Sequence, residues 1–456
     1  MKIWMERGQF SPNIEGVELD SSAFKRNFLF GVATSALQIE GAVSEDGRGR
    51  TVWEKYAEER PGFIQDNAKP DIACDHYHRW REDIELMKKL GVRAYRFSIS
   101  WPRIFPNGRG EINEKGIEFY ENLSKGLKEA GITPWVMLYH ADLPLPLAEN
   151  GGWSNPETIE SYLLYVKAVT KRLGEQVDTW MTFNEPISMV NDDLNMNNRS
   201  LKDALQGGHH VLLAHGKAVD IIRKNSPSAK VGIVLNMEPV YPASKKAEDK
   251  KAARMLDRSF NHWFLDPLYG KGYPKDILDF YGDDAPQIHA GDYETITTRT
   301  DFLGVNYYHS FHGEHDANAP MNAKRIMEDD VEKTDFGWNI YPQGLYDILK
   351  RIHTEIPAIS SLVVTENGAS FHDTMSPDGS VKDYRRIRYL QEHLKAVQKA
   401  KQEGLPVDGY FVWSLMDNFE WRAGYKERFG LIFVDYVHNQ QRTIKASGKW
   451  FSHFIS

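Results

Sequence analysis

Two glutamates stand at the ends of apolar segments, in a pattern that suits nucleophilic and acid–base chemistry. Glu185 lies in Thr-Phe-Asn-Glu-Pro and Glu366 lies in Val-Thr-Glu-Asn-Gly, each with an asparagine beside it. The chain carries 64 Asp and Glu residues, most of them expected to be solvated charges, but strand-like apolar residues lead directly into these two. Two carboxylates that face each other across a glycosidic bond are the minimum that retaining glycoside hydrolysis requires. The pair therefore predicts cleavage of an acetal.

The elements that must position these glutamates alternate along the chain. Short runs rich in β-branched and aromatic residues predict strands, and the longer amphipathic stretches between them predict helices. The predicted strands span residues 28–35, 94–100, 133–140, 179–185, 230–237, 301–308, 361–366 and 407–414. The predicted helices span residues 75–90, 113–130, 156–173, 203–225, 246–264, 342–353 and 383–403. Gly91, Gly131, Gly174 and Gly404 follow helical runs, where C-terminal caps are expected.

This alternation predicts the α/β class, as a single (β/α)8 TIM-barrel domain over residues 1–456 with an N-terminal extension at 1–20. Active sites of such barrels lie at the C-terminal ends of the strands. Acid, amide, imidazole and phenol side chains gather at the predicted strand ends, as a polar substrate requires. Two long polar connections, 266–300 and 309–336, predict walls or lids of the site, and the Asn-rich segment 186–208 predicts a third, mobile loop.

Composition excludes several classes of protein. The net charge is −8 and no long basic run occurs, which argues against nucleic acid or an anionic membrane as a partner. No stretch approaches the ~18 apolar residues of a membrane span, and we expect no signal peptide. The single cysteine, Cys74, excludes an internal disulfide, and together these features predict a cytoplasmic location. The histidine pairs 76/78 and 209/210 lack a third ligand at metal-site spacing, so no metal or cofactor is expected.

Several motifs, in order, resemble those of glycoside hydrolase family 1, the β-glucosidase-like retaining enzymes. They stand at residues 28–42, 95–104, 182–186, 302–308, 334–344, 364–368 and 409–430, so the resemblance covers nearly the whole chain. It implies the eightfold barrel. It also implies that Glu366 is the nucleophile and Glu185 the acid/base.

The resemblance also implies roles for the neighbours of the two carboxylates. Arg96 and Tyr308 match positions that contact the nucleophile, where a cation and a phenol would keep it ionised; Arg96 could equally serve as a structural ion pair. Asn184 matches the amide that binds the sugar 2-hydroxyl, and Asn306 a position beside the acid/base. The implied substrate-binding residues are Gln38, His140, Trp413, Glu420, Trp421 and Phe429.

One subclass of the family is excluded on charge. Its 6-phospho-glycosidases carry Ser, Lys and Tyr where this chain has Glu420, Glu427 and Phe429. A carboxylate would repel the phosphate, and no cation replaces the lysine. Glu420 suits free 4- and 6-hydroxyl groups instead.

The chain departs from the family pattern near the site. Ala141 follows the sugar-binding histidine and Ile187 follows the Asn-Glu-Pro triplet, where an aromatic residue is usual, and the next loop reads 191–200 in an unusual form. Two readings of this pair stay open. The enlarged space admits an unusual glycone or a bulky aglycone, or the loosened site acts weakly on simple glucosides.

These features predict a retaining β-glycosidase that removes terminal β-D-glucosyl residues, with β-galactosyl or β-fucosyl residues as further substrates. A transglycosidase shares the same glycosyl-enzyme and passes the sugar to another acceptor instead of water. A sugar-binding homologue with impaired catalysis is the alternative from another class, although such proteins usually lose one of the carboxylates. The partner is a small glycoside or oligosaccharide, and the sequence indicates no oligomeric state.

Overall fold

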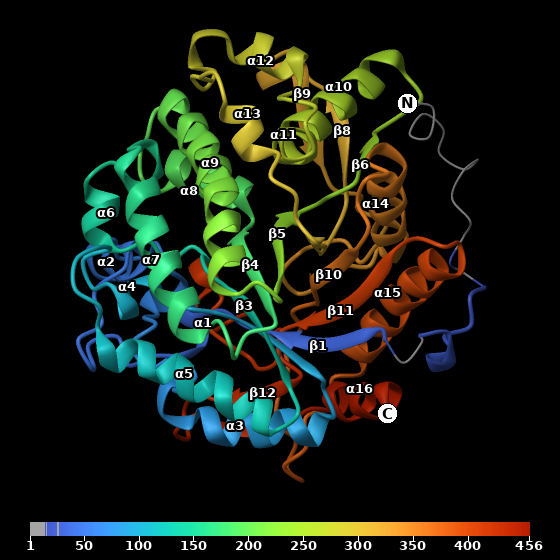
Figure 1. Ribbon diagram of the computed structural model, residues 1–456. Helices are drawn as coiled ribbons and strands as arrows, with labels where there is room; N and C mark the ends of the chain where they lie inside the picture. Colours follow the sequence, from blue (N-terminus) through green and yellow to red (C-terminus); the bar gives the residue numbers. More distant parts are fainter. Residues whose placement is uncertain (1–13, 15, 25–26) are drawn as a thin grey trace.

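Eight parallel strands form a closed barrel in the computed structural model, which describes residues 14, 16–24 and 27–456 (Figure 1). Around the barrel the strands follow the order β1-β11-β10-β7-β5-β4-β3-β2, so consecutive elements of the chain are neighbours. Their bounds are β1 Leu29–Ala33, β2 Ala94–Ser98, β3 Thr133–Met137, β4 Thr179–Asn184, β5 Lys230–Asn236, β7 Phe302–Asn306, β10 Leu362–Asn367 and β11 Val407–Trp413. All eight predicted strands are confirmed, and so is the TIM-barrel class.

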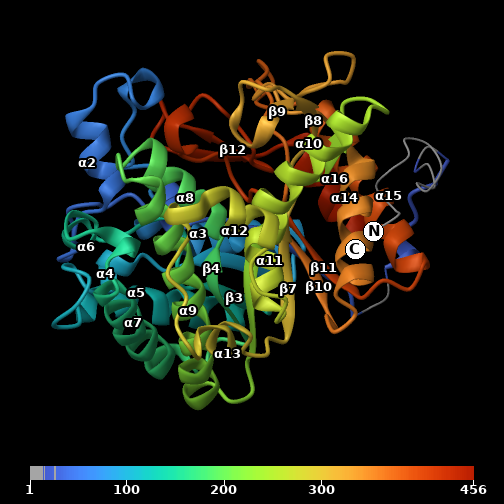
Figure 2. The same cartoon turned by 90° about the horizontal axis from the view of Figure 1, so that it is seen from above.

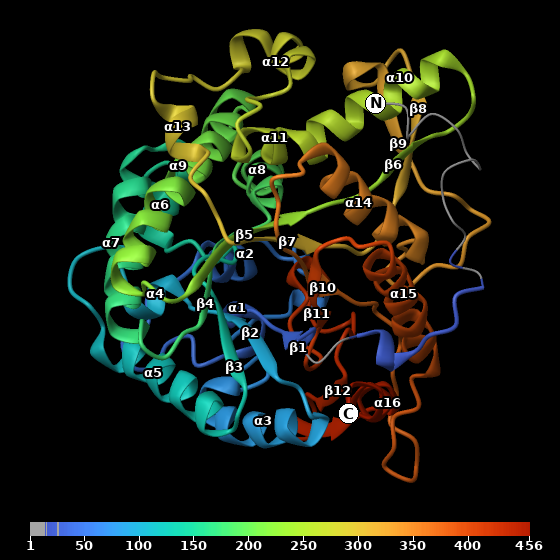
Figure 3. The same ribbon diagram turned by 45° about the vertical axis from the view of Figure 1, so that its right-hand side comes forward.

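Helices surround the barrel, as Figures 1 and 3 show from two sides. The longer ones are α3 His76–Leu90, α5 Glu114–Glu129, α7 Glu157–Leu173, α9 Leu201–Asn225, α10 Ala247–Asp257, α14 Pro342–Glu355, α15 Tyr384–Gln402 and α16 Ala446–Ile455. In α5, Ile117, Tyr120, Leu123 and Leu127 recur at helical spacing and are buried against the strands. The seven predicted helices are confirmed. The one over 246–264 divides into α10 and α11 (Trp263–Leu268), joined by a π-helical turn.

The predicted caps differ in conformation. Gly91, Gly131 and Gly404 have positive φ angles of 71°, 75° and 86°, as expected of a left-handed helix end. Gly174 instead keeps a right-handed φ of −56°. A Cβ at Gly174 would lie 2.5 Å from the Thr170 carbonyl oxygen and 2.7 Å from that of Asn225. Gly174 is the C-terminal cap of α7, as predicted, and close approach of backbone explains why the residue there is glycine.

Aromatic rings fill the barrel interior below the site. The ring of Trp135 lies 5.3 Å from that of Phe302 and 4.9 Å from that of Phe411, between centroids. Gly31 leaves room for them, since a Cβ there would lie 2.4 Å from the Phe411 ring. Two strands lose regular register at their C-terminal ends, β4 between Met181 and Asn184 and β10 between Val364 and Glu366. Such irregularities re-aim side chains at barrel rims.

The connections that follow the strands are partly structured. Residues 309–336 contain β8 Phe311–His315 and β9 Ala323–Ile326, which pair with β6 Val240–Pro242 in a small sheet. A hairpin, β12 Ile432–Asp435 with β13 Gln441–Ile444, follows the last barrel strand. Figure 2 shows α2 (Val52–Glu59), β8, β9 and β12 in the upper part of that view. Residues 266–300 hold α12 Lys275–Tyr281 and α13 Asp292–Ile296, and they do not line the cavity described below.

The segment 186–208 differs from the predicted loop. It forms α8 (Pro186–Asn195) and the start of α9, with Pro186 at the first helical position, where its missing N–H costs nothing. Ser200 caps α9 by accepting the Asp203 N–H at 3.1 Å. Its many asparagines made the segment resemble a loop, but apolar residues at helical spacing decide the outcome. The predicted extension 1–20 lies mostly outside the described residues.

Candidate active site

Glu366 ends β10 with both carboxylate oxygens engaged. The Tyr308 hydroxyl donates to Oε2 at 2.6 Å, and the Arg96 guanidinium donates to Oε1. Burial raises the pKa of Tyr308 well above its ordinary value, so the phenol remains a donor. Arg96 is fully buried in β2 and pairs with no carboxylate other than Glu366 among the ion pairs of the described residues. A cation and a donor on opposite oxygens stabilise the ionised form that a nucleophile requires.

Glu185 lies in surroundings that favour its protonated form, in contrast to those of Glu366. It caps the start of α8 with a left-handed φ of 50°, which aims its side chain across the cavity. Asn306 donates to its Oε1 at 2.7 Å and Ser188 to its Oε2 at 3.0 Å, and no cation pairs with it among the residues described. Burial, followed by the negative charge of Glu366, raises the pKa of Glu185 to about 7. It can therefore hold a proton near neutral pH.

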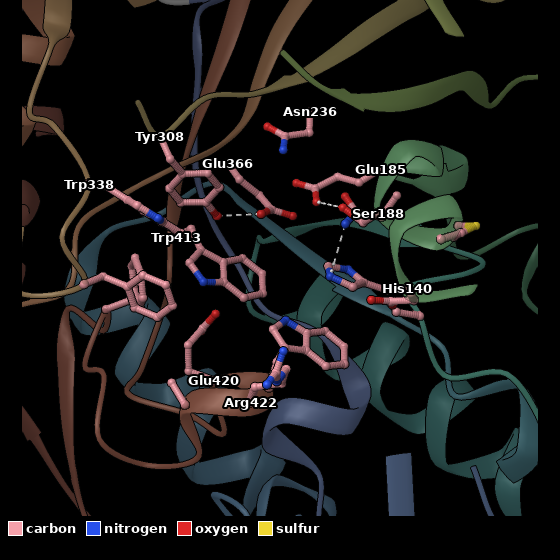
Figure 4. Close-up of a pocket in the computed structure, with 18 of the residues that line it drawn as sticks. His140, Glu185, Ser188, Asn236, Tyr308, Trp338, Glu366, Trp413, Glu420 and Arg422 are labelled. Carbon is pink, nitrogen blue, oxygen red and sulfur yellow. Dashed lines mark hydrogen bonds between the residues drawn. The ribbon is translucent and has the colours of Figure 1, made fainter. Parts of the chain in front are cut away.

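Asn184 connects the two carboxylates. Its Oδ1 accepts from Arg96 Nη2 at 2.7 Å and from Asn306 Nδ2 at 3.0 Å. Arg96 continues to Glu366 and Asn306 continues to Glu185, so one chain of donors holds both acids. Figure 4 shows Glu185 and Glu366 directed into the same cavity from different strands. The structure thus brings together the six residues expected to perform or support the chemistry: Glu185, Glu366, Arg96, Asn184, Asn306 and Tyr308.

His140 presents a neutral ring to the cavity. Asn184 Nδ2 donates to its Nε2 at 3.2 Å, which leaves the proton on Nδ1. Burial and the Arg96 charge hold the pKa of His140 well below its ordinary value. Its ring lies nearly parallel to those of Trp413 and Trp421, with centroid distances of 5.8 and 6.0 Å. The two indole rings offer flat apolar surfaces for the face of a sugar ring, and the imidazole offers a polar group for a hydroxyl at its edge.

The cavity has a volume of about 370 Å³, within the usual size of a small-molecule site. Glu420 lies in its lower wall in Figure 4, and Phe429 belongs to the lining. Burial and the charges of Glu366 and Glu427 raise the pKa of Glu420 to about 8. Glu427 lies behind this wall, where it accepts from Ser370. Near neutral pH Glu420 can therefore meet a substrate hydroxyl as a protonated acid, and it forms no ion pair with Arg422 of the same cavity among the described residues.

Gln38 is placed differently from the other predicted substrate-binding residues. It is fully buried and is absent from the cavity lining. Its Nε2 donates to Asn418, to the Phe419 carbonyl and, at 3.3 Å, to Glu420 Oε2. Gln38 thus holds Glu420 in position, and a direct contact between Gln38 and the sugar stays a prediction.

Ala141 and Ile187, paired as departures from the family pattern, face different spaces. Ala141 lines the active-site cavity, with a left-handed φ of 62°. Ile187 lies on the opposite face of α8, in a separate groove with Trp263 and Phe311. The expectation that both enlarge one site is therefore wrong for Ile187, because a helix turns successive residues by about 100°.

Sequence reasoning missed several residues of the cavity. They are Trp53, Ser188, Met189, Asp192, Met196, Glu238, Trp338 and Arg422, whereas Asn236, expected among the polar residues at the strand ends, does line the cavity. Ser188 and Asp192 stand three and seven residues after Glu185, a spacing that a helix brings to one face. Recognising a helix after Pro186 would have found both. No group of three or more His, Cys, Asp or Glu residues is arranged to hold a metal ion in the described chain, nor is any described helix suited to cross a membrane.

Comparisons with known proteins agree with this site. The model of the family described as glycosyl hydrolase family 1 matches residues 20–456. Beta-glucosidase A of Thermotoga maritima is 43% identical over 95% of this chain and 97% of its own length. A solved structure of the family 1 β-glucosidase of that organism superposes with a TM-score of 0.91 at 42% identity, covering 95% and 98% of the two chains. A 6-phospho-beta-galactosidase of Clostridium acetobutylicum is 36% identical, over 94% of this chain and 96% of its own. The chain therefore belongs to glycosyl hydrolase family 1.

Proposed function

We propose that this protein is a retaining β-glucosidase that hydrolyses terminal, non-reducing β-D-glucosyl residues. The observation that carries the proposal is that two carboxyl groups in one cavity have contrasting surroundings, one favouring the ionised form and the other the protonated form. Glu366 is bound by a cation and a phenol, whereas Glu185 is buried without a cation and has a pKa raised to about 7. Double displacement requires one ionised and one protonated carboxyl group.

The first step forms a covalent intermediate. A Glu366 oxygen attacks the anomeric carbon, and the bond from that carbon to the leaving oxygen breaks as Glu185 gives the oxygen its proton. Once Glu366 is esterified it carries no negative charge. Its repulsion of an ionised Glu185 is then lost, so the pKa of Glu185 falls. This change prepares Glu185 to act as a base.

The second step reverses the proton transfer. Glu185 takes a proton from water, the water oxygen bonds to the anomeric carbon, and the ester bond to Glu366 breaks. Two inversions at one carbon leave the β configuration unchanged. Asn184 joins the donors that hold both acids, so it is suited to bind the neighbouring hydroxyl throughout.

Glucose is the proposed glycone because the β-glucosidases named above share the whole fold. β-Galactosides and β-fucosides are further proposed substrates, since they differ from glucosides at the positions that Glu420 is expected to bind. A 6-phosphate would meet the Glu420 carboxyl group in the cavity wall, and Arg422 of the same cavity forms no ion pair with Glu420 among the described residues, which argues against phosphorylated substrates. Neither transglycosylation nor simple sugar binding has an observation in its favour.

A panel of nitrophenyl glycosides tests the proposal. We expect release of nitrophenol from the β-glucoside, with the β-anomer of glucose appearing first by NMR, and none from the α-glucoside or the 6-phospho-β-glucoside. The matched control is Glu366→Gln, which keeps the shape of the side chain but removes the nucleophile. An α-anomer as first product, or equal activity of the control, would refute the mechanism.

We also propose a cytoplasmic location. It is supported by the single cysteine, Cys74, which is buried and unpaired, so that no disulfide depends on an oxidising compartment. Fractionation of the source cells, with activity measured in each fraction, tests this. Activity confined to the medium would contradict it.

A further inference from the structure

A second, smaller cavity adjoins the active-site cavity beside Ala141. It has a volume of about 30 Å³, and we call it the side chamber. The residues that line both cavities form the boundary between them: Trp53, Ala141, Met189, Asp192 and Met196. The chamber itself is completed by residues of α2, of the segment after β3 and of α8: Val52, Tyr56, Tyr139, Leu143, Ala148, Gly152, Trp153, Asp193, Asn197 and Arg199.

Ala141 contributes only a methyl group to this boundary, and we infer that the two cavities communicate here. This residue follows His140, and α8 forms the other side of the opening. The family usually carries an aromatic side chain where this chain has Ala141, and a ring on that Cβ would fill the space between the two cavities. The flexible thioethers of Met189 and Met196 form part of the remaining boundary and adapt to different shapes. The opening therefore lies next to His140, so a substituent on a sugar hydroxyl bound by that ring would be directed toward it.

The chamber wall is partly polar. The Tyr56 side chain is only 4% exposed, and no atom of the described residues accepts or donates a hydrogen bond at its hydroxyl. Burial raises the pKa of Tyr56 to about 12, so the hydroxyl remains a donor. The Asp192 carboxylate borders the opening, and Asp193 is already engaged by Asn197 Nδ2 at 2.7 Å. A buried hydroxyl without a partner is destabilising, and a polar guest that bonds to it removes this penalty.

The volume limits what can enter. A water molecule needs roughly 10–15 Å³ by this kind of measure, so the chamber holds about two waters or a substituent of two to three heavy atoms. A complete second sugar ring is therefore excluded. Arg199 also lines the chamber, but its Nη2 donates to the Ala148 carbonyl at 2.9 Å, and the two acids Asp192 and Asp193 disfavour an anionic group such as a phosphate or sulfate.

We propose that the side chamber receives a short hydroxylated substituent carried on the sugar hydroxyl that faces His140, so that this enzyme cleaves β-glucosides whose terminal glucosyl unit is itself etherified there. The inference rests on the proposed function and goes beyond it, because it names a class of substituted glycone. The reaction is unchanged, since the substituent lies away from the anomeric carbon.

The test uses nitrophenyl β-glucoside and its ethers, each ring hydroxyl in turn bearing a methyl or a 2-hydroxyethyl group. For one position, the wild-type enzyme is expected to retain about a tenth or more of the kcat/KM of the parent glucoside. At that position Ala141→Trp is expected to lower the ratio of ether to parent kcat/KM by about 100-fold, because the added ring occupies the chamber entrance. Ala141→Leu provides the same readout if the larger residue prevents folding.

Two further variants separate the chamber from general effects. Ile187→Trp adds the same ring to the groove on the other face of α8 and is expected to leave the ether-to-parent ratio unchanged. Tyr56→Phe is expected to remove any preference for the 2-hydroxyethyl over the methyl ether. Rejection of every ether by the wild type, or an equal effect of Ala141→Trp at all positions, would overturn the inference while the proposed function stands. Failure to cleave the parent glucoside overturns the proposed function and this inference with it.

Discussion

The hydroxyl of Ser188 tunes the proton affinity of Glu185, and its removal should shift the pH dependence of the enzyme. Ser188 Oγ donates to Glu185 Oε2 at 3.0 Å. This bond favours the ionised form and opposes the rise in pKa caused by burial and Glu366. Ser188→Ala removes the donor without disturbing the helix, since alanine is the best helix former.

The size of the shift follows from the bond that is lost. A hydrogen bond to a charged group contributes about 1.5–3 kcal/mol, and one pKa unit corresponds to about 1.36 kcal/mol. Because water can enter the vacated space and replace part of the bond, we expect a rise of about one unit. The pKa of Glu185 would then move from about 7 to about 8.

The sign is fixed by the role of Glu185. It must be protonated to assist the leaving group, so the alkaline limb of kcat/KM should move to higher pH by about one unit. An aryl glucoside with a poor leaving group is the substrate to use, because only such a substrate needs the proton. On the falling limb the variant should exceed the wild type by up to about tenfold, each relative to its own plateau.

Asp192→Asn is the matched comparison on the same face of α8. Burial, with the charges of Asp193 and Glu185, raises the pKa of Asp192 to about 7, so the two acids disfavour each other's ionisation. Removing this charge should move the limb to lower pH or leave it in place. A limb that stays fixed or falls in Ser188→Ala, or that rises in both variants, would refute the reasoning.

Three further perturbations test other parts of the structure. Glu366→Gln should lower kcat by roughly 10⁵-fold or more while calorimetry still detects sugar binding, and loss of binding instead would contradict a purely chemical role. Tyr308→Phe removes one donor to the nucleophile and should lower kcat by about 10–100-fold, with a smaller effect on thermal stability; an unchanged kcat would exclude this contact from catalysis. Lys445→Met should destabilise the protein by about 1–3 kcal/mol in chemical denaturation, because it removes the ammonium from the buried Asp373 and Asp417, which keep only Arg386 and Arg428 as cationic partners among the described residues; an unchanged free energy of unfolding would show that the ammonium contributes nothing.

The barrel and the two catalytic acids could be predicted because local and global signals agree. Apolar runs of strand length end directly at Glu185 and Glu366, and parallel barrel strands bring such ends to one rim. The bridge through Asn184 could not be derived from spacing, because Arg96 and Asn306 reach it from strands far apart in the chain. The family resemblance indicated that these residues belong to the site. Only the structure shows that their hydrogen bonds link the two catalytic glutamates.

The sequence could not predict which way several side chains point. Their direction depends on whether the residue lies in a helix, a strand or a loop, and this was assigned wrongly for one segment. The Asn-rich composition of 186–208 favoured a loop, so the sequence did not predict which of its residues face the active site. The partners of Gln38, namely Asn418, Phe419 and Glu420, could not be derived from the sequence either, and its contact with the sugar stays a prediction. The sequence predicted which residues lie near the site. It did not predict their hydrogen-bond partners, and these partners determine what each side chain does.

Helix α8 shows how one misassigned element changes the reading of a site. Its residues divide between two faces at helical spacing. Ser188, Met189, Asp192 and Met196 face the active-site cavity; Ile187, Val190, Asn191 and Leu194 line the groove on the other side. Since Glu185 caps this helix, changes on the cavity face alter its proton affinity and the shape of the opening beside Ala141. Changes on the outer face act through packing, so a substitution at Ile187 should affect stability before selectivity. Of the two departures from the family pattern, only Ala141 faces the active-site cavity, so the proposed effect on which sugars are accepted is assigned to Ala141 and not to Ile187.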